Sequence, residues 1–217
     1  MITLAVLDIA GTTVQEHGAV YRALAEAVDA PESLIPPWMG ADKEEAIKGL
    51  LTELGRTATP ELVSTLYADF RQRLDDSYTV KPPEPLPRVT DALAHLRSNG
   101  VQVALTTGFD RAVTDTIVRA VGWQDTLDAV ICTEDVPQGR PAPYMIYHAM
   151  EATGVVDISQ VLVAGDTTRD LQSGTNAGAA MVIGVLTGGQ DAETLGAVRH
   201  THILPSVADI PDLLGHQ

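Results

Sequence analysis

Residues 2–13 read Ile-Thr-Leu-Ala-Val-Leu-Asp-Ile-Ala-Gly-Thr-Thr, an apolar run that ends in an aspartate and a polar turn. The run Ile2–Leu7 is short and mostly apolar, which is typical of a strand buried on both faces. Asp8 follows at the carboxyl end of that strand, where open α/β sheets bind ligands, and Gly11 permits a tight turn behind it. Asp8 is therefore a candidate nucleophile or metal ligand, with the carboxylate of an Asx-turn as the alternative.

Similar short apolar runs recur along the chain, and helical periodicity lies between them. The further runs are Val101–Leu105, Ala129–Cys132, Val161–Ala164 and Met181–Val185, with a last short strand expected at His202–Leu204. The helical patterns are Val89–Arg97, Arg111–Val121, Pro143–Ala152, Thr168–Ala177 and Val207–Leu214. Strands that alternate with helices predict an α/β fold, a parallel sheet with helices on both faces.

One region interrupts this alternation with helical patterns alone, over Tyr21–Val28, Glu44–Leu54 and Pro60–Leu74. Four prolines in the segment Lys81–Pro87 then make a stiff, extended linker that cannot continue a helix. We expect a core domain of residues 1–16 and 85–217 and an inserted helical cap of residues 17–84. An insert at this strand end overhangs the ligand edge of the sheet, which favours a lid over a purely structural insert.

Composition limits the classes of partner. The chain has 217 residues, and its 29 acidic against 14 basic residues give a formal charge of −15. Such a charge argues against nucleic acid and anionic membranes as partners, although a local cation still permits a small anionic substrate. A single cysteine, Cys132, and the lack of a leader or bilayer-spanning run predict a cytoplasmic protein without disulfides or a membrane partner. The expected assembly is a monomer or a homodimer.

Polar clusters follow three later strands. Thr106-Thr107-Gly108 offers a hydroxyl and backbone N–H groups near a helix start, which suits an anion unless it is a simple N-cap. Arg140, in Gly139–Pro143, is a permanent cation suited to phosphate oxygens, or else a surface arginine. Asp166 and Asp170 lie four apart as a helix begins, so they can hold a divalent cation with Asp8, or merely compensate the helix dipole.

In this order on successive strand ends, the clusters resemble the haloacid dehalogenase superfamily with a helical lid after the first strand. The resemblance extends over essentially the whole chain, and it implies a Rossmann-like core, Mg²⁺ and an aspartyl-phosphate intermediate. It implies that Asp8 is the nucleophile, that Thr106 binds phosphate and that Arg140 orients the nucleophile and the phosphoryl group. The implied metal ligands are Asp8, the carbonyl of Ala10, Asp166 and Asp170. The expected phosphate and substrate contacts are Thr12, Thr107, Gly108 and Met39.

Ala10 departs from the pattern of the superfamily's phosphatases, which place a second aspartate two residues after the nucleophile. That aspartate is a general acid and then a base, so an ordinary phosphoester reaction would lose a contribution of about 10²–10⁴-fold. Ala10-Gly11-Thr12-Thr13 and Gly139-Arg140-Pro141 are similar to one branch, phosphonoacetaldehyde hydrolase and its phosphonatase-like relatives. There the leaving group is carbon, and a lid lysine forms a Schiff base that accepts electrons.

Lys43 matches that lysine, because Met39-Gly40-Ala41-Asp42-Lys43 is similar to the branch's Met-Gly-x-x-Lys. The chain has only two other lysines, Lys48 and Lys81. The branch's histidine three residues later is replaced by Ala46, and acidic residues flank Lys43 and favour its ammonium form. Lys43 therefore forms an imine, reads substrate charge as an ammonium, or is a solvated surface lysine.

The sequence thus predicts a Mg²⁺-dependent phosphonatase-like hydrolase that acts on a small anionic phosphonate such as phosphonoacetaldehyde or a relative. One alternative is a phosphomonoesterase of the same superfamily that acts on a small phosphorylated metabolite. A second is a non-catalytic binder of phosphorylated ligands, although a binder has no need of the nucleophile Asp8.

Overall fold

A computed structural model describes residues 1–215 and contains a six-stranded sheet in which every pair of neighbouring strands is parallel. The strand order is β5-β4-β1-β6-β7-β8, so β1 lies at the centre. The strands are β1 (Leu4–Asp8), β4 (Gln102–Thr106), β5 (Ala129–Ile131), β6 (Val161–Gly165), β7 (Met181–Val185) and β8 (His202–Leu204). The predicted α/β fold is confirmed, and each strand lies within one or two residues of its apolar run.

Burial on both faces explains why β1 is apolar from Leu4 to Leu7. All five of its residues are buried. Because successive side chains point to opposite faces, Leu4 and Val6 pack with one hydrophobic cluster, whereas Ala5 and Leu7 pack with another. The sheet therefore needs a layer of helices on each side.

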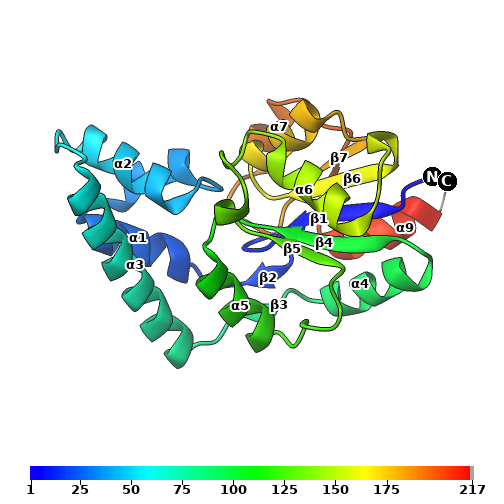
Figure 1. The fold of residues 1–217 in the computed structure, drawn as a ribbon, viewed down its shortest axis with the longest axis horizontal. Helices are drawn as coiled ribbons and strands as arrows, with labels where there is room; N and C mark the ends of the chain where they lie inside the picture. The colour runs from blue at the N-terminus through cyan, green and yellow to red at the C-terminus, as the bar shows by residue number, and fades with distance from the viewer. Residues whose placement is uncertain (216–217) are drawn as a thin grey trace.

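Figure 1 shows these two layers. One face carries α4 (Val89–Ser98), α5 (Arg111–Ala120) and α9 (Ile210–Gly215), and the other carries α6 (Tyr144–Thr153) and α7 (Thr168–Ala177). The short helix α8 (Ala192–Gly196) lies beside α7. The predicted helix Val207–Leu214 is in fact a 3₁₀ turn, Val207–Asp209, that leads into α9. The other 3₁₀ turns are Glu32–Leu34, Pro36–Trp38, Thr133–Asp135 and Ile158–Gln160.

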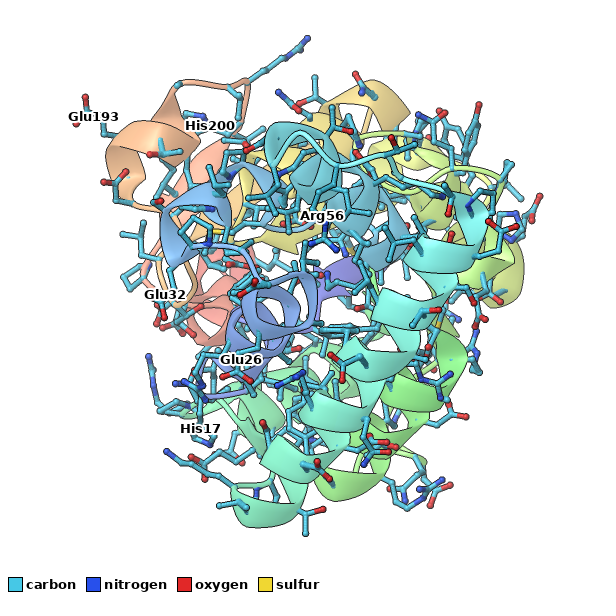
Figure 2. The ribbon with its side chains drawn as sticks, turned by 90° about the vertical axis from the view of Figure 1, so that its left-hand side faces the viewer. His17, Glu26, Glu32, Arg56, Glu193 and His200 are labelled. Carbon is cyan, nitrogen blue, oxygen red and sulfur yellow. The ribbon has the colours of Figure 1, made fainter. Side chains whose placement is uncertain are left out.

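Three helices, α1 (Ala19–Val28), α2 (Lys43–Glu53) and α3 (Pro60–Val80), form a separate group at one end of the molecule. Figure 2 looks onto this group, with Glu26 pointing outward from α1 and Arg56 near the middle of the view. Arg56 Nη1 donates to the Val28 carbonyl at 2.8 Å and so ties the end of α2 to the end of α1. Helix α3 runs six residues beyond Leu74, where its apolar pattern predicts an end, because Tyr78 extends its buried face.

Two short strands that sequence periodicity does not reveal connect this group to the sheet. β2 (Val14–Gln15) pairs antiparallel with β3 (Glu84–Pro85), the latter inside the proline-rich linker. His17, at the lower left of Figure 2, has a positive φ of 59°, and its Nε2 lies 3.5 Å from Glu84 Oε1. The chain therefore enters and leaves the three helices through one paired connection.

The carboxyl ends of β1, β4 and β6 meet at the edge of the sheet that faces the three helices, and the start of α2 points at that edge (Figure 1). Both termini of the drawn ribbon lie at the opposite end. Among the described residues, no helix has the length and apolarity that a membrane crossing requires.

Candidate active site

A small cavity lies between the sheet edge and the start of α2. Its volume is about 20 Å³, enough for roughly one water molecule. Its walls include the end of β1, the loops after β1, β4, β5 and β6, helix α1, and the start of α2 with the loop before it. The lining residues are Asp8, Ala10, Val20, Tyr21, Gly40, Lys43, Thr107, Gly108, Phe109, Arg140, Asp166 and Thr167. A substrate larger than water therefore requires the helical group to move away from the sheet.

Arg140 is the buried cation of this site. Its side chain is only 4% exposed, its Nη2 lies 2.8 Å from Asp8 Oδ1, and its Nη1 donates to Asp170. Burial opposes the charge and lowers the pKa of Arg140, but the carboxylates of Asp170 and Asp8 outweigh burial and raise it above its usual range. Arg140 Nε has no hydrogen-bond partner within residues 1–215, so one buried donor is left for an anionic ligand.

Three buried carboxylates, Asp8, Asp166 and Asp170, place one oxygen each within 4.8 Å of one another. Asp166 accepts from Thr12 Oγ1 at 3.0 Å and from the Gly189 N–H at 3.1 Å. Burial and the neighbouring carboxylates raise the pKa of Asp166, and burial likewise raises that of Asp8 against the lowering by Arg140. Buried anions this close repel one another, and a cation among them would relieve that repulsion.

The donor set of this cluster fits a hard divalent cation. Carboxylate and carbonyl oxygens are the ligands that Mg²⁺ and Ca²⁺ prefer, and the side chains of Asp8 and Asp166 line the cavity beside Ala10. Gly11 permits the close approach of this loop to Asp166: its φ is 81°, and an added Cβ would lie 2.8 Å from Asp166 Oδ2. Asp8, Asp166 and Asp170 therefore form a candidate metal centre.

Two of the expected substrate contacts, Thr107 and Gly108, lie in the loop after β4 and line the cavity. Thr106, the last residue of β4, pairs with Asp8 on one side and Ile131 on the other and is not among the residues that line the cavity. Gly108 has no room for a side chain, since a Cβ there would lie 2.6 Å from the Ala41 carbonyl oxygen.

Lys43 begins α2 and is 5% exposed, so it is not the solvated surface lysine that was one of the three alternatives. Its Nζ donates to the Ala41 carbonyl at 2.8 Å and lies 5.0 Å from the centre of the Phe109 ring. Burial lowers the pKa of Lys43 to about 8 and outweighs the opposing effect of Asp42. Desolvation therefore lowers the pKa of Lys43 by more than the neighbouring acidic residues raise it.

Two expected substrate contacts are placed elsewhere. Thr12 is buried, and its hydroxyl donates to Asp166, so it orients a carboxylate instead of lining the cavity. Met39 packs against Gly189, the residue whose N–H binds Asp166, and does not line the cavity either. Thr12 therefore contacts the acidic cluster directly, and Met39 contacts Gly189, which binds it.

Sequence reasoning missed Tyr21, Phe109 and Thr167 as cavity residues. Thr167 caps α7 by accepting from the Asp170 N–H, and its hydroxyl donates to Asp170 Oδ2 at 2.5 Å. Its place directly after Asp166 was a usable signal. Tyr21 had none, because it reads as one residue of an amphipathic helix. Burial and the nearby carboxylates, Asp166 foremost, raise the pKa of Tyr21 and keep its phenol protonated.

A model of the haloacid dehalogenase-like hydrolase family matches residues 2–178. Among curated proteins, the chain is 28% identical over 213 residues to the phosphonoacetaldehyde hydrolase of Bacillus cereus, covering 88% of this chain and 78% of that protein. It is 33% identical over 139 residues to a bifunctional phosphonoacetaldehyde hydrolase/aminoethylphosphonate transaminase of Clostridioides difficile. That match covers 62% of this chain but only 21% of the length of the bifunctional protein.

Among solved structures, the fold is similar to that of a phosphonoacetaldehyde hydrolase-like protein from Oleispira antarctica. The TM-score is 0.83 at 20% sequence identity, and the match covers 99% of this chain and 92% of the other. At this identity the likeness concerns the fold, which has a comparable layout over nearly the whole chain.

Proposed function

The chain belongs to the haloacid dehalogenase-like hydrolase family, and from that premise we propose that it hydrolyses a small phosphonate, such as phosphonoacetaldehyde or a relative, with Mg²⁺. The observation that carries the proposal is the placement of Lys43 in the same cavity as Asp8, beside Ala10 instead of an acid. The curated phosphonoacetaldehyde hydrolases among its relatives support this choice of substrate.

Asp8 is the nucleophile in this proposal, and its carboxylate oxygen attacks phosphorus to give an aspartyl phosphate. Arg140, 2.8 Å from Asp8 Oδ1, holds the carboxylate in place, and its unpartnered Nε is available to a phosphoryl oxygen. The Thr107 hydroxyl and the Gly108 N–H bind further phosphoryl oxygens at the opposite wall. Water then hydrolyses the aspartyl phosphate to phosphate and frees Asp8.

Asp8, Asp166, Asp170 and the carbonyl of Ala10 would hold the Mg²⁺ ion. When bound, the ion supplies positive charge that offsets the repulsion between Asp8 and the incoming phosphoryl group. Thr12 and the Gly189 N–H keep Asp166 oriented for this role, at 3.0 and 3.1 Å.

Lys43 supplies the electron sink. With its pKa lowered to about 8 by burial, a sizeable fraction of the amine is neutral near pH 8. The neutral amine adds to the substrate aldehyde, loses water and becomes a protonated imine. When Asp8 attacks, the electron pair of the P–C bond passes into this imine to give an enamine. Protonation and hydrolysis then release acetaldehyde and restore Lys43, so no acid is needed at Ala10.

The decisive experiment measures phosphate release from phosphonoacetaldehyde with Mg²⁺, with and without borohydride. We expect substrate-dependent inactivation by borohydride, with the reduced adduct mapped to Lys43. Lys48→Ala is the matched control, because Lys48 lies on the same helix but is exposed and pairs with Glu44. Asp8→Asn should abolish turnover, which shows that the activity measured belongs to this site. If Lys43→Ala then turns over phosphonoacetaldehyde as fast as wild type, the imine route is ruled out.

One observation favours the alternative phosphomonoesterase. Lys43 Nζ is well placed as an ammonium, because it donates to the Ala41 carbonyl and faces the Phe109 ring. Ala46, in place of the branch's histidine, is fully buried within the helical group and offers no proton shuttle. Rapid hydrolysis of phosphate esters without phosphonate turnover would select this alternative.

A further inference from the structure

One face of α7 holds the loop that carries Arg140. Arg169, Ser173 and Asn176 are spaced i, i+4 and i+7, so they share a face of the helix. Each donates to a different carbonyl of three consecutive residues: Arg169 Nη1 to Arg140 at 3.0 Å, Asn176 Nδ2 to Pro141 at 2.8 Å and Ser173 Oγ to Ala142 at 2.8 Å. The same helix carries Asp170, which accepts from the Arg140 guanidinium. Arg140 is therefore anchored to α7 at both its backbone and its side chain.

Arg169 differs from the other two anchors because it also reaches across to the helical group. Its Nη2 lies 3.0 Å from Glu45 Oε1, and its Nη1 lies 3.4 Å from Glu45 Oε2. Glu45 lies two residues after Lys43 in the first turn of α2. The Arg169 guanidinium therefore links Arg140, which pairs with Asp8, to α2, the helix that begins with Lys43.

The geometry separates two roles for Arg169. The bond to the Arg140 carbonyl joins α7 to the loop after β5 and does not itself cross to α2. The pair with Glu45 exists only when α2 lies against the sheet, as it does in this closed arrangement. The closed cavity holds about one water, so a substrate needs more room than this arrangement gives, and movement of α2 away from the sheet would break the Glu45 pair.

We propose that Arg169 is a positioning residue that couples closure of α2 over the cavity to the orientation of Arg140. The inference rests on the proposed function only in taking Arg140 as the cation beside the nucleophile. When α2 closes over the cavity, Glu45 pairs with the Arg169 guanidinium and fixes its orientation. The guanidinium then holds the Arg140 carbonyl in the same arrangement that places Lys43 in the cavity. Small misplacements of such a group slow a reaction strongly, so a distant anchor has a measurable effect on rate.

The test compares Glu45→Gln, Arg169→Met and Arg169→Lys in steady-state turnover of phosphonoacetaldehyde. Glu45→Gln breaks the pair across the seam that fixes the Arg169 fork, so we expect KM to rise about two- to fivefold and kcat to fall about two- to threefold. Arg169→Met also frees the Arg140 loop, so we expect kcat to fall on the order of tenfold. Arg169→Lys keeps one cationic donor in place of the fork, and we expect it to recover part of the kcat lost in Arg169→Met.

Glu44→Gln is the matched control, because Glu44 lies next to Glu45 on α2 but pairs only with the exposed Lys48 at 3.1 Å. We expect wild-type KM and kcat for it. The double variant Glu45→Gln/Arg169→Met should have the KM of Arg169→Met alone, since both changes break the same pair. Equal kcat in Arg169→Met and wild type, or fully additive KM effects, would overturn the inference.

A second measurement does not need turnover. Beryllium fluoride with Mg²⁺ mimics a phosphoryl group at an aspartate, and ¹⁹F NMR reports its affinity directly. We expect Arg169→Met to bind it about tenfold more weakly than wild type and Glu44→Gln to bind it equally. If the protein does not turn over phosphonoacetaldehyde but Arg169→Met still binds beryllium fluoride more weakly than wild type, the proposed substrate is wrong and the role of Arg169 stands. Equal beryllium fluoride affinity in wild type and Arg169→Met counts against the role of Arg169.

Discussion

Arg140 lies between Asp8 and Asp170, with Nη2 2.8 Å from Asp8 Oδ1 and Nη1 donating to Asp170. The cation therefore lies between two of the three carboxylates of the acidic cluster, although the chain as a whole has a formal charge of −15. Both carboxylates and the guanidinium are buried, so solvent screens their interactions little. Removal of the cation leaves two buried carboxylates without their cationic partner.

Replacing Arg140 by Met is expected to lower the free energy of unfolding by about 3–5 kcal/mol in the presence of EDTA. The loss arises because Asp8 and Asp170 remain buried without their partner. Urea denaturation measures it, and added Mg²⁺ should restore more stability to this variant than to wild type. Arg88→Met is the control, since Arg88 pairs with Asp209 at the surface and its loss should cost about 0–1 kcal/mol. Equal losses in the two variants would contradict the central role of Arg140.

The metal-free protein is expected to lose stability as the pH rises. Burial raises the pKa of Asp8 and Asp166, so the native state keeps protons that the unfolded chain releases above about pH 4. The native state then binds more protons than the unfolded chain, and the free energy of unfolding falls between about pH 4 and neutrality. Mg²⁺ prefers the ionised carboxylates, so its stabilising effect should grow over the same range.

Thermal unfolding in EDTA and in Mg²⁺, followed from pH 5 to pH 8, measures this difference. Asp166→Asn should flatten the dependence in EDTA, because the amide does not titrate, and should weaken the response to Mg²⁺. If the melting temperature of wild type in EDTA rises from pH 5 to pH 8 relative to that of Asp166→Asn, the pKa of Asp166 is not raised in the folded protein.

The rate of borohydride trapping at Lys43 is expected to increase with pH, with a midpoint near 8. Only the neutral amine attacks an aldehyde, and burial lowers the pKa of Lys43 to about 8. The rate of adduct formation with phosphonoacetaldehyde, followed by mass spectrometry at fixed substrate, measures the midpoint. A midpoint near 10, the ordinary range of lysine, would show that the amine is not desolvated when the substrate binds.

The sequence predicted the sheet and the four polar strand ends because their signals are local. Buried parallel strands require continuous apolar runs, and Asp8, Asp166 and Asp170 follow such runs directly. Local signals do not specify which neighbour faces the cavity, so Thr106, Thr107 and Gly108 were all expected there, and Thr107 and Gly108 line it. They also do not reveal Tyr21 or Arg169, whose roles depend on contacts between α1 or α7 and distant segments. The pKa of Lys43 was likewise misjudged from its acidic neighbours, because burial is a tertiary property.

Replacing Tyr67 by Phe is expected to weaken closure of the helical group. Tyr67, on α3, donates to Asp110 Oδ2 at 2.6 Å, and Asp110 caps α5 directly after the cavity residue Phe109. Loss of this bond should raise the KM for phosphonoacetaldehyde about three- to tenfold and leave kcat within about twofold. Tyr78→Phe is the control on the same helix, since the buried Tyr78 hydroxyl has no partner within residues 1–215. An unchanged KM in Tyr67→Phe would show that this contact does not hold the closed state.

Replacing Ala10 by Asp is expected to convert the site toward phosphoester hydrolysis. Ala10 lines the cavity two residues after Asp8, so an aspartate there can protonate a departing alkoxide. Hydrolysis of glycerol 2-phosphate, whose alkoxide needs a proton, should rise on the order of 10²-fold. Hydrolysis of p-nitrophenyl phosphate, whose nitrophenolate leaves without one, should change far less. Ala10→Asn has the same size without an acidic proton and should show neither gain. If wild type already hydrolyses glycerol 2-phosphate as fast as Ala10→Asp, Ala10 is not what limits ester chemistry, and the argument for a carbon leaving group fails.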